Sequence, residues 1–476
     1  MSSPSESYLV FSDVHLGSDL DDRQGNAPRR SSTIDSDLVA LLAHYRRTPP
    51  EADRWHVIIA GDFIDFIGMT IATPKGAPLE TELTDEEQAH GLGGASDHAR
   101  EKLRRVVARH AAVFDALAAF VADGHALTVI HGNHDIELHW DGVKDDFRAA
   151  LVRSARDARG DAFDAAAFEA RVAFNPWFFW RDGVAFIEHG HQYDALCATP
   201  LVMTPLSPLD PRRIARGFCD VLLRYVVRPT RGMTESGHEH VGLAYYLRFG
   251  ARLGLSGMIM LGVRFAAAVR ELFRLRRASL AEAAQALRAE HERRVASFAA
   301  ATRIGIDKLR ALLALQAEPV TSSVRGIMQS VLLDRLALAA AAALATALVL
   351  CLGLAGVFHG SVVSACTAFA PIALAWALAH AWLSRQRTID PGARMAERAT
   401  QLAKLFPAAF VVMGHTHVPQ AAPAGEATYI NLGSWAETEA DTAVAARTHL
   451  VIRVGADGAS AELRAWSPPG PRRFDA

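Results

Sequence analysis

Short apolar runs rich in Val and Ile recur along the chain, and each of the first four is followed within two residues by Gly, Asp or His or ends in one of them. The runs fall into two groups: YLVF (8–11), HVIIAG (56–61), ALTVIHG (126–132) and VAFIEHG (184–190), then FVVMGH (410–415), ATYINLGS (427–434) and THLVIRV (448–454). Continuous apolar runs of this length are typical of strands covered on both faces. The stretch 96–122 has a helical pattern, so we predict an α/β fold with polar loops at the strand ends.

The segment 200–395 separates the two groups and differs from them in character. It is rich in Arg, Ala and Leu, and it carries almost no strand pattern. Strong helix formers and alternating charges over 265–317 predict one or two long helices. We therefore predict a core in two parts, 1–199 and 396–476, interrupted by a large all-α insertion over 200–395.

Two uncharged stretches within this insertion, 336–358 and 361–383, are each 23 residues long. At a rise of about 1.5 Å per residue, each would span roughly 35 Å, which exceeds a hydrocarbon core of about 30 Å. Arg335 and Arg385 flank the pair, and the short connection has no Lys or Arg, so both outer ends are expected on the cytoplasmic side. We predict a transmembrane hairpin over 336–383. The alternative is a buried, Ala-rich helical hairpin that packs on itself or in a dimer, and the protein would then be cytoplasmic.

Charge and cysteine usage exclude some classes of protein. A net charge of −2 gives no dominant basic surface, so no nucleic-acid polymer is expected as a partner. The four cysteines show no CxxC spacing, which argues against a zinc knuckle and a disulfide framework and favours a reducing compartment.

Asp, His and Asn residues gather where the predicted strands end. Five blocks, SDVHLGS, GDFID, GNHD, EHGHQYD and GHTHVP, contribute Asp13, His15, Asp62, Asp65, Asn133, His134, His189, His191, His415 and His417. Open α/β sheets bind ligands at the carboxyl ends of their strands, so these loops are expected to meet in one crevice. Carboxylate, imidazole and amide ligands suit Mn, Fe or Zn. Two ions about 3.5–4 Å apart need a bridging carboxylate, for which Asp62 is the obvious candidate.

The five blocks, in this order, resemble the pattern of the calcineurin-like metallophosphoesterases: D-x-H, GD-x-x-D, GNH-[D/E], H and GH-x-H. The match covers roughly 6–197 and 405–456. The resemblance implies a four-layer α/β/β/α sandwich and two divalent ions, with Mn²⁺ favoured and Fe or Zn as alternatives. It further implies that Asp13, His15, Asp62 and His417 hold one ion, and that Asp62, Asn133, His189 and His415 hold the other.

His134 resembles the catalytic histidine of that family, with Asp65 as its acidic partner. An ionised carboxylate favours the imidazolium, which can stabilise phosphoryl charge and protonate a leaving oxygen. Either His189 or His191 can be the ligand from EHGHQYD; His189 is preferred because it directly follows the strand, which leaves His191 near the substrate. The remaining titratable residues around GNHD are expected to be structural or to face the substrate: His131, Glu137 and His139.

The SDVHLGS and HG-x-Q-Y-D blocks are similar to the branch that contains UDP-2,3-diacylglucosamine pyrophosphatases, which cleave a lipid-linked pyrophosphate at the inner membrane. His191 stands where that branch has Asp. This resemblance and the hairpin predict a phosphodiester or pyrophosphate hydrolase of a lipid-linked or membrane-proximal substrate, anchored in the inner membrane with its catalytic core in the cytoplasm. The alternatives are a membrane-tethered hydrolase of soluble phosphoesters, such as cyclic nucleotides or phosphoproteins, and a metal-binding scaffold without turnover.

Overall fold

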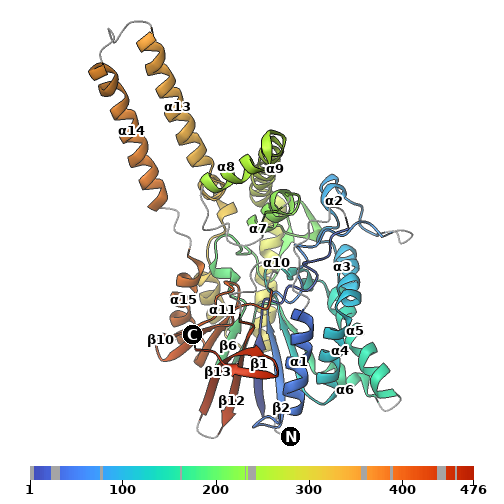
Figure 1. The fold of residues 1–476 in the computed structure, drawn as a ribbon. Coiled ribbons are helices and arrows are strands. Elements are labelled where there is room, and N and C mark those ends of the chain that lie inside the picture. Colours follow the sequence, from blue (N-terminus) through green and yellow to red (C-terminus); the bar gives the residue numbers. More distant parts are fainter. Residues whose placement is uncertain are drawn as a thin grey trace. The chain divides into compact units, whose positions relative to one another are not determined.

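The computed structural model describes ten stretches of the chain: 5–22, 33–74, 79–160, 163–230, 232–233, 243–354, 362–385, 390–436, 446–455 and 458–475. They belong to two units, drawn together in Figure 1. The sheet unit comprises Met1–Thr234, Ala278–Pro319 and Pro391–Ala476, and the helical unit comprises Glu235–Arg277 and Val320–Asp390. The sheet unit therefore contains both predicted core parts and also three stretches of the predicted insertion, 200–234, 278–319 and 391–395.

The first sheet of the sheet unit has seven strands in the order β14-β13-β12-β1-β2-β3-β4. They are β1 (Glu6–Phe11), β2 (Arg54–Ala60), β3 (Ala126–Ile130), β4 (Val172–Asn175), β12 (Thr448–Gly455), β13 (Gly458–Ser467) and β14 (Gly470–Arg473). Strands β1 to β4 run parallel, and β12 pairs antiparallel with β1. Phe11 pairs with Ile59, and Ala60 with Ile130. The loops after β1, β2 and β3 therefore leave the sheet at one edge.

The second sheet has five strands in the order β10-β11-β9-β6-β5. They are β5 (Phe178–Arg181), β6 (Gly183–Glu188), β9 (Ala408–Met413), β10 (Gln420–Ala424) and β11 (Ala427–Asn431). The three central strands are parallel, and Ile187 on β6 pairs with Val412 on β9. The loops after β6 and β9 consequently start side by side.

Three clusters of buried apolar side chains place helices on the outer faces of the two sheets. The first joins alternate residues of β1 to β3 to α1 (Thr33–Arg47), α3 (Ser96–Arg109), α4 (Ala111–Ala122) and α5 (Asp141–Arg159). The second joins β6, β9 and β11 to α10 (Glu282–Thr302), α11 (Ile306–Leu315) and α15 (Pro391–Leu405). The third lies between the sheets, where Val10 and Ile58 of one meet Ile187 and Val412 of the other.

The seven predicted strands are confirmed, whereas the single helix predicted over 96–122 is two helices. α3 ends at Arg109, and the buried ring of the next residue, His110, accepts a hydrogen bond from Gly17 N (3.1 Å) and donates one to Asp35 Oδ2 (2.6 Å). These tertiary bonds, which no local pattern reveals, fix the break between the helices.

The prediction that 200–395 is wholly helical is wrong at residues 206–214. There β7 (Leu206–Ser207) and β8 (Asp210–Ile214) form a two-stranded hairpin. Arg213 on β8 is buried and donates to both carboxylate oxygens of Glu87, at 3.0 and 2.9 Å. Contacts with a distant acidic residue stabilise this strand, so local propensity does not predict it.

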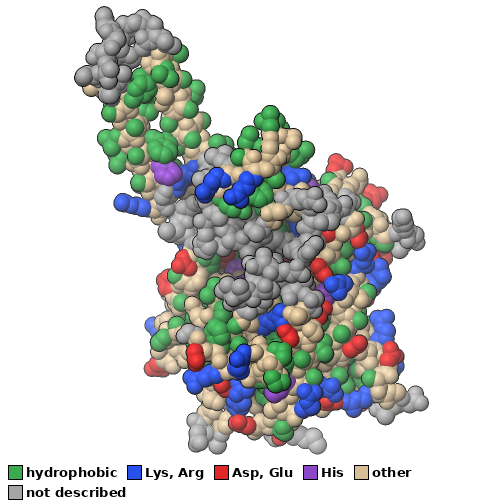
Figure 2. All heavy atoms as spheres, viewed as in Figure 1, with side chains coloured by type: hydrophobic (Ala, Val, Ile, Leu, Met, Phe, Trp, Pro, Cys, Tyr) green, Lys and Arg blue, Asp and Glu red, His purple; other side chains and the backbone are tan. Residues whose placement is uncertain are grey.

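The helical unit contains two long apolar helices, α13 (Leu333–Leu354) and α14 (Val362–Arg385), which contact each other. Much of the apolar surface of both helices is exposed: Leu344 is 73% and Leu378 is 62% accessible. Figure 2 shows hydrophobic side chains along both helices. Among the described residues, one helical segment, Leu333–Cys351, is long and apolar enough to cross a membrane; the apolar part of α14, Thr367–Leu383, is shorter. Residues 355–361 of the predicted hairpin lie outside the described residues.

The apolar helices contribute no described residue to the three clusters that hold the two sheets. Replacing Leu336–Leu383 by a short Gly/Ser linker should therefore leave the sheet unit folded, with a change in unfolding free energy below about 1 kcal/mol, or a few degrees in Tm. Circular dichroism melting and gel filtration without detergent test this. A deletion product that unfolds or aggregates would instead favour a hairpin buried in a dimer.

Candidate metal centre

The loops that follow five parallel strands bring the expected ligands together in the sheet unit. β1 leads to Asp13 and His15, β2 to Asp62 and Asp65, and β3 to Asn133 and His134; β6 leads to His189 and His191, and β9 to His415 and His417. Potential ligand atoms within 4.8 Å of one another form four groups among the described residues, three of which contain only predicted site residues.

The carboxylate of Asp62 lies at the centre of this arrangement. Its Oδ2 is 3.2 Å from His189 Nε2 and 3.6 Å from His15 Nε2, and its Oδ1 accepts a hydrogen bond from His134 N at 2.8 Å. Burial opposes its ionisation, but the charges of His189 and His134 outweigh burial and hold the pKa of Asp62 well below its usual range. Asp62 is therefore ionised at neutral pH and touches residues from both halves of the predicted ligand set.

Asp13 organises the side of the centre that β1 and β9 supply. Its Oδ1 lies 3.2 Å from His417 Nε2, and its Oδ2 accepts hydrogen bonds from Ser12 Oγ (2.5 Å) and His415 N (3.1 Å). The side chains of Asp13, His15 and His417 form one of the groups that could hold an ion. The structure thus assembles these predicted ligands from opposite ends of the chain.

His189 shows most clearly that the donor set fits a cation. Its Nδ1 donates to the carbonyl of Ala60 at 3.0 Å, which leaves Nε2 facing Asp62 Oδ2 and Asn133 Oδ1, each 3.2 Å away. Burial opposes protonation of His189, but Asp62 and Asp13 outweigh it and raise its pKa to about 9, so a proton occupies Nε2 in this environment. A divalent ion would take the place of that proton, and donation from the other ring nitrogen is typical of metal-binding histidines. His191 is buried with its Nε2 against Gln192 Nε2 (2.9 Å), so the geometry favours His189 as the ligand.

Five of the predicted ligands have left-handed backbone conformations. Among the described residues, seven that are not glycine have positive φ, and five of these are Asp13 (54°), His15 (49°), Asp62 (50°), His415 (69°) and His417 (61°). Such conformations cost on the order of 1 kcal/mol or more each, and they cluster where function demands a particular side-chain direction. The strain therefore marks the same residues as the motifs do.

Two glycines, Gly61 and Gly132, allow the loops after β2, β3 and β6 to lie in close contact. A Cβ on Gly61 would lie 2.6 Å from the ring of His189, and a Cβ on Gly132 would lie 2.0 Å from Asp62 Oδ1. Asp135, the last residue of GNHD, ties the two loops together by accepting from Gly132 N (2.6 Å) and Phe63 N (2.8 Å). The GNHD turn is thereby fixed against the loop that carries Asp62.

His134 and Asp65 form a hydrogen-bonded pair beside the ligand group. His134 Nδ1 lies 2.7 Å from Asp65 Oδ1, and the His134 side chain is 20% exposed, whereas Asp65 is buried. Burial lowers the pKa of His134, but Asp62 and Asp65 more than offset this and raise it to about 10. The pair therefore presents a protonated imidazole at the accessible side of the centre.

Arg228 contacts Asp65, the partner of His134. The sequence analysis did not identify Arg228 as a site residue. Its Nη2 lies 3.6 Å from Asp65 Oδ2, and its Nη1 donates to Ser18 O at 2.9 Å. It follows α7 (Phe218–Leu222) and a π-helical turn (Leu223–Val227), an irregularity often found at functional sites. Arg224 and Arg228 are four residues apart, which places them on one face of a helix, and this spacing could have identified them. The segment contains so many arginines that the pair did not stand out.

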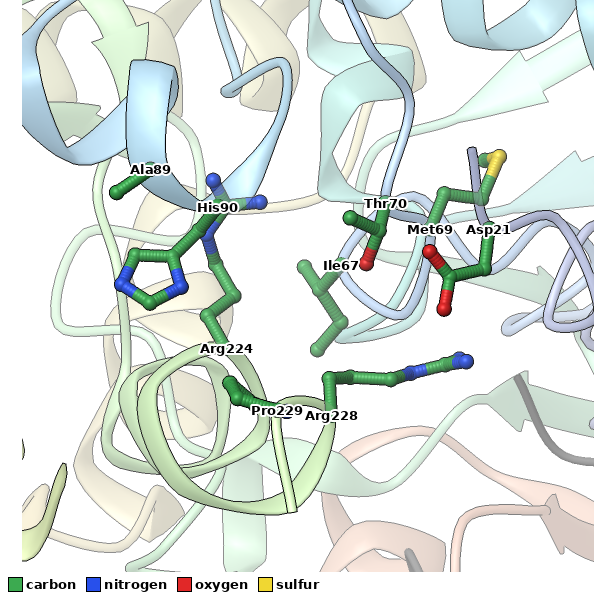
Figure 3. Close-up of a pocket in the computed structure, with 9 residues that line it drawn as sticks. All are labelled: Asp21, Ile67, Met69, Thr70, Ala89, His90, Arg224, Arg228 and Pro229. Carbon is green, nitrogen blue, oxygen red and sulfur yellow. The ribbon is translucent and has the colours of Figure 1, made fainter. Parts of the chain in front are cut away.

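A pocket opens beside Arg228, as Figure 3 shows. Ile67, Met69 and Thr70 from the loop after β2 lie across from Arg228 and Pro229. The remaining lining residues are Asp21, Ala89, His90 and Arg224. The pocket has a volume of about 20 Å³, which is enough for one or two water molecules. Arg228, which lines it, also contacts Asp65.

Asp194, the last residue of the EHGHQYD block, was given no role by the sequence analysis. Its Oδ2 lies 3.0 Å from His415 Nε2, so it orients that ring as a carboxylate behind a ligand histidine does. The Cys197 thiol lies within 4.8 Å of ligand atoms of both residues, although no thiol was expected near the site. His131, Glu137 and His139 belong to none of the metal-binding groups found among the described residues.

Comparison with known proteins adds no assignment. No protein-family model matches the chain, and no curated protein matches it. The functional interpretation therefore depends on the geometry of the site and on the motif resemblance.

The central place of Asp62 predicts unequal effects of two substitutions on metal content. Asp62→Ala should lose at least one of two Mn²⁺ ions per chain, because it removes the oxygens that both ligand groups share, whereas His134→Ala should retain most of the metal. Inductively coupled plasma mass spectrometry on protein loaded with Mn²⁺ measures both. Equal metal loss in the two variants would contradict the division of roles.

The contact between Asp194 and His415 predicts a weaker effect. Asp194→Ala should reduce Mn²⁺ affinity about 10- to 100-fold, as expected for losing the partner of a ligand histidine. The exposed Asp182 provides a matched control, because Asp182→Ala removes an equal charge outside the centre. Isothermal titration with Mn²⁺ compares them, and equal affinities in the two variants would refute an orienting role for Asp194.

Proposed function

We propose that the protein is a dinuclear metal-dependent phosphoesterase that hydrolyses a phosphodiester or pyrophosphate bond of a lipid-linked or membrane-proximal substrate. The observation that carries this proposal is the convergence of oxygen and nitrogen donors on buried Asp62, with the His134–Asp65 pair beside them. Two sheets with helices on their outer faces agree with the four-layer sandwich that the motif resemblance implies.

Under this proposal, Asp13, His15, Asp62 and His417 hold one divalent ion, and Asp62, Asn133, His189 and His415 hold the other. Mn²⁺ is the expected metal, with Fe or Zn as alternatives, because the set mixes carboxylate, imidazole and amide donors. When bound, such ions supply the acidity that makes water nucleophilic at neutral pH, and they neutralise charge on the phosphoryl oxygens.

The chain's own acid is His134. Asp65 accepts a hydrogen bond from His134 Nδ1–H and favours the charged ring, so Nε2–H is available to a phosphoryl or leaving-group oxygen. Arg228 and Gly68 N, which donates to Asp65 Oδ1 at 2.8 Å, hold the aspartate in place.

The membrane part of the proposal is supported by the exposed apolar surfaces of α13 and α14. Arg335 and Arg385 lie near the outer ends of the two helices, as expected if these ends meet the cytoplasmic side of the inner membrane. An active site anchored in this way suits an amphiphilic phosphate ester, because enzyme and substrate share the membrane surface.

Assays on Mn-loaded protein in detergent micelles test the function. We expect turnover of UDP-2,3-diacylglucosamine in preference to bis-p-nitrophenyl phosphate, and a loss of about 10²- to 10⁴-fold in His134→Ala, which removes the acid. His44 lies on α1 and makes an edge-to-face contact with Trp466; His44→Ala is the matched control and should keep full activity.

The other outcomes separate the alternatives. Turnover of only the small diester would support the dinuclear chemistry and contradict the lipid-linked substrate. The absence of turnover on both substrates, in protein that retains two metal ions, would contradict the hydrolase and favour a metal-binding scaffold.

A further inference from the structure

Two cysteines far from each other in sequence meet beside the candidate metal centre. Cys197 Sγ lies 3.1 Å from Cys219 Sγ, and both side chains are free thiols that are partly exposed. Cys197 belongs to the loop that follows the short helix His191–Tyr193, and Cys219 belongs to α7. The pair thus joins the core to a segment of the predicted insertion within the sheet unit.

The surroundings of the pair connect it to both sides of the centre. Cys197 N donates to Asp194 O at 3.0 Å, and the Asp194 carboxylate contacts His415. Cys219 lies at the start of the helical segment that leads to Arg228, which contacts Asp65. A covalent link between the two thiols would therefore tie the segment that orients His415 to the segment that supports the His134–Asp65 pair.

We propose that Cys197 and Cys219 are a modification site that reacts with a small-molecule disulfide, such as oxidised glutathione, to form a reversible intrachain disulfide. One cysteine, as the thiolate, attacks the glutathione disulfide, and a protein–glutathione bond forms as the first glutathione leaves. The second cysteine then attacks the bonded protein sulfur and releases the second glutathione. The two cysteines lose two electrons and two protons in total, and these reduce one glutathione disulfide to two thiols.

The geometry favours the second step over accumulation of the mixed disulfide. A disulfide bond is about 2.05 Å long, so the two sulfurs must approach by only about 1 Å from their present separation. The fold already holds the attacking thiol beside its target, and both cysteines are partly exposed residues. This proposal is independent of the hydrolase activity, because the bond forms between protein thiols alone.

Mass spectrometry of the full chain tests the proposal. In a C351S/C366S background in detergent micelles, incubation with oxidised glutathione followed by alkylation and digestion should yield a peptide pair joined through Cys197 and Cys219. Dithiothreitol should reverse the link. The further variants C197S and C219S should each stop at a single mixed disulfide with glutathione, which shows that both positions react.

Two results would overturn the proposal. One is that both thiols remain fully alkylated after the incubation; the other is that both carry glutathione without forming a link. If a serine variant fails to fold, the linked peptide from the two-cysteine protein still decides the outcome. A second incubation in the presence of EDTA tests whether the two thiols bind a metal ion such as zinc instead of reacting with glutathione disulfide. A link that forms equally with and without EDTA supports the proposal. Thiols that bound zinc protects from reaction contradict it.

A second readout concerns the metal centre and rests on the proposed function. Because Asp194 is three residues from Cys197, the link is expected to disturb the contact with His415 and to weaken Mn²⁺ binding several-fold, with recovery on reduction. Titration of oxidised and reduced protein measures this. A link with unchanged Mn²⁺ affinity leaves the modification site intact and contradicts only its effect on the centre.

Discussion

The buried carboxylate of Asp62 is the contact on which the rest of the site depends. It stands at the end of a central strand, close to His189 from the other sheet and His15 from the neighbouring strand, and it accepts the backbone N–H of His134. A buried anion of this kind is stable only when opposite charges compensate it. The histidines provide part of that compensating charge. A pair of divalent ions, bound by the carboxylate, imidazole and amide groups around Asp62, would supply the rest.

The two-sheet core makes this concentration of polar groups possible. Parallel strands in register deliver their loops to one edge, and the apolar cluster between the sheets fixes the distance between them. The well-packed layers hold five of the candidate ligand residues in left-handed conformations that they would otherwise leave. The same rigidity makes Gly61 and Gly132 necessary, because any Cβ there would meet His189 or Asp62.

The sequence predicted the parts of this arrangement that follow from local pattern. Buried parallel strands appear as continuous apolar runs, and the residues at their ends identify the candidate ligands. Arg228, Asp194 and Arg213 were not predicted, because each acts through a partner far away along the chain: Asp65, His415 and Glu87. The break between α3 and α4 and the short hairpin over 206–214 were missed for the same reason, since tertiary hydrogen bonds rather than local propensity determine them.

Anomalous X-ray diffraction from crystals of the Mn-loaded protein tests the central claim most directly. The account predicts two anomalous peaks about 3.5–4 Å apart, with the Asp62 carboxylate between them, Asp13, His15 and His417 at one, and Asn133, His189 and His415 at the other. A single peak, or two peaks of which neither is bound by Asp62, would contradict it.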